Sequence, residues 1–149
     1  MLERVNKLDE AVFRRDKHHS VVFGMETTWH IDAAFVRRYV DEPLQCVLKV
    51  VNDIFFNDRF PENKTVRFVD NMFEVCRGSG WTRFGDEKDN LLLKVAGRAI
   101  DVIDCVAAGV SGRLDDFIAA FRSDDEDLLM AVKNELDVHL FMTLFMTGA

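Results

Sequence analysis

The chain has 149 residues, of which 48% are hydrophobic and 30% are charged, and its formal net charge is −7. This length suits one domain with a buried core, and the composition argues against an intrinsically disordered chain. The negative average charge disfavours non-specific binding to the phosphate backbone of nucleic acids, although it leaves room for a local basic patch.

Residues 1–20 are predicted to form an amphipathic helix, or the remnant of a coiled coil, ahead of a single α+β domain over residues 21–149. The apolar residues Leu2, Val5 and Val12 recur at helical spacing with charged residues between them. They are therefore candidate interface residues. The charged N-terminus does not resemble a signal peptide.

Two helices are predicted next, over residues 33–40 and 43–56. Asp32 is a suitable N-cap for the first, because its side chain can accept a hydrogen bond from a free backbone N–H. Pro43 stands in the first turn of the second, where its missing N–H would be unpaired anyway. Trp29 is expected to pack beneath the start of the first helix, and a ligand-stacking role is the less favoured alternative.

A three-stranded antiparallel meander is predicted over residues 65–69, 72–76 and 81–84. Apolar and polar residues alternate in these segments, as they do on strands with one buried face. An Asp-Asn pair joins the first two strands, since both residue types tolerate the positive φ of a tight hairpin turn. A Gly-Ser-Gly run joins the last two.

Three further helices are expected to cover the meander. Asp86 begins the first, and the second covers residues 114–121. Ser123 and Glu126 fit a capping box for the last helix, roughly residues 124–145. The prediction is therefore an α+β fold, predominantly helical, in which a small three-stranded antiparallel meander packs against about five helices.

The turn before the meander contains two polar candidates for binding, Glu62 and Asn63. They are expected mainly to cap the turn after Pro61, with the Asn63 side chain bonding local backbone. The alternative is that they face a partner beside the meander.

Basic side chains and a tryptophan in and around the meander form a second candidate binding set. Because alternate residues of a strand share a face, several of these side chains can lie together on the solvent side. Arginines beside an exposed tryptophan would suit stacking of single-stranded nucleic acid. The set is Lys64, Arg67, Arg77, Trp81 and Arg83.

An apolar run near the C-terminus exceeds what one buried helix face requires, and it supplies the candidate interface residues Leu140, Phe141, Leu144 and Phe145. The run is far shorter than the roughly 20 residues needed to span a membrane, so no membrane partner is expected. These features, with no recognisable catalytic motif, favour a non-enzymatic protein–protein interaction or self-association module. The alternative is a nucleic-acid-associated regulatory protein that uses an Arg-bearing face of the meander.

No metal or cofactor is expected from the cysteines or histidines. Cys46, Cys76 and Cys105 are widely separated in apolar surroundings and lack the spacing of metal ligands. Buried free thiols in a reducing, intracellular compartment are the expected state.

The block from residue 50 reads VVNDIFFNDRFPENKTVRFVDN, and from residue 73 it continues FEVCRGSGWTRFGDEKDNLLLKVAGRAIDVID. It resembles a C-terminal domain of unknown function found in paralogous proteins of large DNA viruses of amoebae, fish and algae. In that family a helix ends near IHFNPxxPENHNI, followed by a strand, a valine, a tryptophan and a helix of DxDxVLDxLI character. Pro61, Glu62 and Asn63 match that motif, and Trp81 falls at the family's tryptophan. The resemblance covers roughly residues 21–145.

This resemblance implies a location in the host cytoplasm or the virion, but it brings no established activity to transfer. Many relatives carry an N-terminal zinc-binding segment, which is not present in full here. Phe55 and Lys64 also stand where the family has histidines. A nucleic-acid role inferred from the zinc segment therefore does not carry over.

Overall fold

The computed structural model describes residues 21–78, 80–84 and 87–147, with side chains described as far as residue 144. Within these ranges the fold is α+β and predominantly helical, with five α-helices and one three-stranded antiparallel sheet, as the sequence predicted. The predicted helix at residues 1–20, with Leu2, Val5 and Val12, lies outside the described residues, as does the side chain of Phe145.

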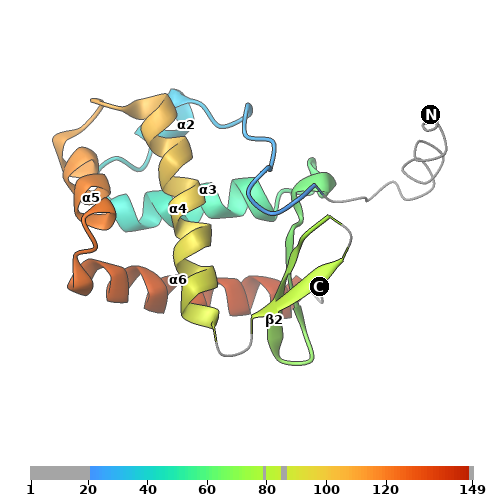
Figure 1. Cartoon of the computed structure of the whole chain (residues 1–149). Coiled ribbons are helices and arrows are strands. Elements are labelled where there is room, and N and C mark those ends of the chain that lie inside the picture. The colour runs from blue at the N-terminus through green and yellow to red at the C-terminus, as the bar shows by residue number, and fades with distance from the viewer. Residues whose placement is uncertain (1–20, 79, 85–86, 148–149) are drawn as a thin grey trace.

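Three long helices form the body of the molecule (Figure 1): α3 (Pro43–Phe55), α4 (Lys88–Ala107) and α6 (Glu126–Thr147). The α4 helix crosses α3 and α6 and contacts both, so its buried face is the centre of the core. The short α2 (Ala33–Arg37) packs on α4, and α5 (Gly112–Arg122) closes the end of the body opposite the sheet.

The helix starts follow the sequence signals only in part. The carboxylate of Asp32 caps α2 by accepting the Phe35 backbone N–H at 3.0 Å, as predicted, although α2 ends at Arg37 and not at residue 40. Pro43 occupies the first turn of α3, also as predicted. The α4 helix begins at Lys88, and Asp86, its predicted first residue, lies outside the described residues.

The capping box predicted to begin at Ser123 is wrong. The Ser123 hydroxyl donates to the Ala119 carbonyl oxygen at 2.7 Å, so this residue caps the C-terminus of α5. The carboxylate of Asp125 instead accepts the Leu128 backbone N–H at 3.0 Å at the start of α6. The α5 helix continues one residue beyond its predicted end, to Arg122, and α6 begins at Glu126, two residues later than predicted.

The sheet has the predicted meander topology, with strands β1 (Val66–Val69), β2 (Met72–Cys76) and β3 (Trp81–Phe84) in that order. Asp70 and Asn71 join β1 to β2 with φ values of 53° and 64°. Positive φ at both central residues is what a tight two-residue hairpin requires, and it explains the Asp-Asn pair.

One face of the sheet packs against the helices. Val66, Phe73, Val75 and Phe84 are buried on this face. The Phe68 ring on the same face meets the Phe141 ring of α6 edge-on, with centroids 5.5 Å apart. Figure 1 shows the sheet standing at the end of the helical body, where its other face points away from the helices.

The core-facing stripe of α6 corrects the predicted interface. Buried side chains recur every four residues along this helix, at Val132, Leu136, Leu140 and Leu144. Leu140 and Leu144 are 0% and 2% exposed, so they belong to the core and their prediction as interface residues is wrong. Consecutive helical residues are about 100° apart, and a run of apolar residues therefore cannot all face the same way.

Two other predictions of packing are also wrong. Trp29 is 74% exposed, and Ile31 is the residue of this segment that enters the core. Of the cysteines, Cys46 and Cys76 are buried free thiols as predicted, whereas Cys105 is exposed. The Trp29 ring still contacts the Phe60 ring in a T-shaped arrangement, with the two centroids 5.6 Å apart.

Candidate functional site

An ionic row crosses all three strands of the sheet. The strand register places Glu74 between Arg67 and Arg83, so the three side chains share one face. Arg67 Nε donates to Glu74 Oε1 at 2.7 Å, and Arg83 Nε donates to Glu74 Oε2 at 2.9 Å. Each carboxylate oxygen of the buried Glu74 thus has its own guanidinium partner.

These contacts fix the charge state of Glu74. The hydrogen bond from Arg67 is the main cause that lowers the pKa of Glu74; burial opposes it, and the bond from Arg83 lowers it further. The carboxylate is therefore ionised at neutral pH. A buried carboxylate that is held in place by two cations stabilises the sheet and is not available as a general base.

The second contact of this row is with the tryptophan. The Arg67 guanidinium carbon lies 4.0 Å from the centroid of the Trp81 ring, a cation–π geometry that covers one face of the indole. The structure thus brings Arg67, Arg83 and Trp81 together. A nucleic-acid base could stack on the covered ring face only by displacing the guanidinium.

The other two basic candidates are not part of this ionic row. Lys64 pairs with Asp58 at 2.5 Å, and this contact lowers the pKa of Asp58 through a hydrogen bond and charge attraction. Arg77 lies over the Phe84 ring on the opposite side of the sheet, 5.8 Å from its centroid. Of the predicted basic set, Arg77 is therefore the residue that lies apart, whereas Lys64 lies beside the cavity that Arg67 and Trp81 also line.

A cavity of about 560 Å³ opens beside Trp81, where the sheet meets the end of α6. Its volume lies in the range of small-molecule and side-chain pockets. Apolar groups and the Lys64–Asp58 ion pair both contribute to its lining. The lining residues are Phe56, Asp58, Lys64, Val66, Arg67, Trp81, Thr143 and Leu144. Among the described residues that line this cavity, no nucleophile is paired with a base.

Asn63 is a structural residue. It is 0% exposed, its Oδ1 accepts the Thr27 backbone N–H at 2.8 Å, and its Nδ2 donates to the Thr27 carbonyl oxygen at 2.7 Å. The prediction of local backbone bonding is wrong, because the partner lies 36 residues earlier in the chain. Glu62 is half-buried, and its carbonyl oxygen accepts the Val21 N–H at 2.8 Å.

A buried carboxylate that the sequence did not single out completes this anchoring. Glu26 accepts hydrogen bonds from the Gly24 N–H, from the Thr65 hydroxyl at 2.6 Å and from Arg98 Nε at 3.2 Å. These bonds connect the segment before α2 to the sheet and to α4. No local pattern signals that this carboxylate is buried, because the two side chains that bind it are 39 and 72 residues away.

The outward face of α6 carries an apolar surface that we call the α6 patch. Its members are Met130, Val138, Phe141 and Met142, which are between 41% and 65% exposed. They lie on the side of the helix away from the buried stripe. The sequence indicated the right helix, but only Phe141 of the described predicted residues belongs to this surface. Placing the apolar run on a helix of 3.6 residues per turn separates its buried residues from its exposed ones.

The described histidines lie in packed positions. His139 Nε2 lies 2.7 Å from Asn52 Oδ1, and burial, with a smaller effect from the charge of Lys49, lowers the pKa of His139. His30 Nε2 lies 3.0 Å from the Asp53 carbonyl oxygen. Within the described ranges, no group of three or more His, Cys, Asp or Glu side chains is arranged to hold a metal ion.

Comparison of the chain with known protein families, with curated proteins and with solved structures finds no match. The resemblance to the viral domain, and the location in a host cell or virion that it implies, therefore stay predictions. Among the described helices, none has both the length and the apolar character needed to cross a lipid bilayer.

Proposed function

We propose that the chain is a non-enzymatic interaction module that associates with a second copy of itself through the α6 patch. One observation carries this proposal: four large apolar side chains are exposed on the outward face of one helix, and three of them, Val138, Phe141 and Met142, lie within about one turn. Scattered exposed apolar residues are normal, but contiguous apolar patches on a monomer are typical of interaction sites. Burying such side chains against a partner is favourable by about 25 cal/mol for each Å² removed from water.

The sequence of α6 suits a two-fold contact. If two copies of the helix pack antiparallel about an axis near residue 136, Met130 of each copy lies opposite Met142 of the other. The same axis places Ala131 opposite Phe141, so a large ring faces a small side chain. Such a contact uses the same patch on both copies, which is the requirement for a closed dimer.

The test is the molar mass in solution. Size-exclusion chromatography with light scattering is expected to give a dimer for the native chain. Val138→Ser combined with Met142→Ser is expected to give a monomer of unchanged circular dichroism spectrum. Met25→Ser is the matched control, because Met25 is 72% exposed but lies before α2 and away from the patch. It should leave the dimer intact.

Two results would count against this proposal. The first is a native chain that stays monomeric at all concentrations measured. The second is a dimer that dissociates equally with Met25→Ser, since an exposed methionine anywhere on the surface would then matter as much as the patch.

A nucleic-acid-associated regulatory protein is the second candidate. It is supported by the shared sheet face of Arg67, Trp81 and Arg83. It has less support than self-association, because Glu74 already pairs with both arginines and the net charge is −7. Fluorescence anisotropy with a single-stranded oligonucleotide tests it. Binding that weakens steeply with salt would favour this candidate, and binding insensitive to salt would exclude it.

A further inference from the structure

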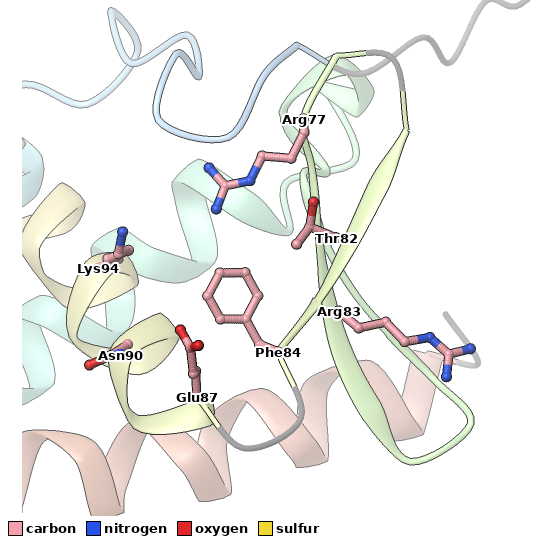
Figure 2. A pocket seen from close by; sticks show the side chains of 7 residues that line it. All are labelled: Arg77, Thr82, Arg83, Phe84, Glu87, Asn90 and Lys94. Carbon is pink, nitrogen blue, oxygen red and sulfur yellow. The ribbon is translucent and has the colours of Figure 1, made fainter.

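A cleft of about 430 Å³ lies between the sheet and the first turns of α4, on the helix-facing side of the sheet (Figure 2). Figure 2 shows the Arg77 side chain extending from the sheet towards α4, with Lys94 on the helical wall and the Phe84 ring between the walls. Arg83 points away from this space. The lining residues are Arg77, Thr82, Arg83, Phe84, Glu87, Asn90 and Lys94.

Two cations of this cleft have no acidic partner among the described residues. Within the part of the chain that the structure describes, neither Arg77 nor Lys94 forms a side-chain hydrogen bond or ion pair. Arg98, one turn further along α4, is by contrast paired with the buried Glu26. In a chain of net charge −7, two cations on facing walls of one cleft form a local positive site that attracts anions.

The remaining lining groups restrict the kind of anion. The Thr82 hydroxyl can donate a hydrogen bond beside Arg77, and both lie on the same wall. Glu87 lies at the other end of the cleft and repels an anionic group there, but its carboxylate can accept a hydrogen bond from a hydroxyl. The volume is within the range of small-molecule sites and is larger than a phosphate ion alone requires.

We propose that this cleft binds the phosphate monoester of a small hydroxylated molecule. Arg77 and Lys94 hold the phosphate, Thr82 donates to one of its oxygens, and Glu87 accepts a hydroxyl of the organic part. The site involves none of the α6 patch residues, so the proposed phosphate binding does not depend on the proposed self-association.

The experiment is an NMR titration of the ¹⁵N-labelled chain with inorganic phosphate and with glycerol 3-phosphate. Saturable shifts are expected at the amides of Thr82, Asn90 and Lys94, with tighter binding of glycerol 3-phosphate. Arg77→Gln and Lys94→Gln are each expected to weaken binding about tenfold, the usual effect of losing one charge-assisted hydrogen bond. Arg37→Gln, which removes an exposed cation of α2, is the matched control and should leave binding unchanged.

Glu87→Gln tests the orientation of the ligand. It is expected to tighten binding of inorganic phosphate, because a repulsive charge is lost, and to reduce the preference for glycerol 3-phosphate. Three results would overturn the proposal: no saturable shifts with either compound, equal weakening by Arg37→Gln, or equal affinity of the native chain for both compounds. Repeating the titration with the Val138→Ser and Met142→Ser chain should give the same affinities.

Discussion

Asn63→Ala is expected to lower the free energy of unfolding by about 3 kcal/mol. The substitution removes two hydrogen bonds, each worth about 1 kcal/mol net, and leaves the half-buried Thr27 N–H and carbonyl without their partner, which costs roughly 1 kcal/mol more. Urea denaturation followed by circular dichroism measures the difference. A loss below about 0.5 kcal/mol would refute the reasoning, because that is the range of substitutions that break no buried contact.

Asn63→Asp separates the lost donor from the lost volume. The carboxylate still accepts the Thr27 N–H, but its second oxygen replaces the amide donor and faces the Thr27 carbonyl oxygen. Repulsion and burial raise the folded-state pKa of the introduced carboxyl above its unfolded value of about 3.9. The destabilisation is therefore complete above the folded-state pKa and is relieved as pH falls through it. Asn90→Ala, at an exposed position of α4, is the control and should change stability by less than about 0.5 kcal/mol.

Three further predictions concern charge, reactivity and packing. Because the two paired arginines lower the pKa of Glu74, the stability advantage of the native chain over Glu74→Gln is expected to persist at neutral pH. This advantage should disappear as the pH falls below 4.5, the ordinary pKa of a glutamate side chain. Thermal melts between pH 7 and 3 measure it, and an advantage that does not change with pH would contradict the prediction. Burial raises the pKa of Cys46 to about 11, so iodoacetamide at pH 8 should label Cys105 in the native chain and Cys46 only after unfolding. Peptide mass spectrometry checks this, and equal labelling rates would refute it. Leu140→Ala should cost about 2–5 kcal/mol in urea denaturation, whereas Glu135→Ala, at an exposed position of the same helix, should cost under about 0.5 kcal/mol. Similar losses would contradict the assignment of Leu140 to the core.

Short-range patterns in the sequence were sufficient to predict most of the helices and strands. The strands Met72–Cys76 and Trp81–Phe84 have the predicted bounds, because alternation and turn chemistry act over only a few residues. Asp70 and Asn71 adopt the positive φ that their position between two strands requires. The start of α6 was harder to predict, since Ser123 can cap either the helix before it or the helix after it.

The contacts that hold the N-terminal segment to the body could not be predicted in the same way. Apart from the Gly24 N–H, which Glu26 accepts locally, the side-chain partners of Glu26 and Asn63 are 36 to 72 residues away, and nothing in the neighbouring sequence identifies them. A buried Glu also runs against the usual exposure of that residue type. It is explained only once Thr65 and Arg98 are seen to satisfy its carboxylate.

Contacts within the fold also determine which side chains can bind a ligand. Arg67 and Arg83 looked equivalent to Arg77 in the sequence, yet the first two neutralise Glu74 and hold the sheet together. Arg77 lies one position beyond β2 on the other side of the sheet, where no described carboxylate meets it. In α6, likewise, Leu140 completes the core while Val138 remains on the surface. A side chain that the fold already uses would have to break a stabilising contact in order to bind a ligand, whereas an unpaired side chain loses only its hydration. We therefore expect binding in the Arg77–Lys94 cleft, and at Met130, Val138 and Met142 of the α6 patch, more than at the arginine row of the sheet.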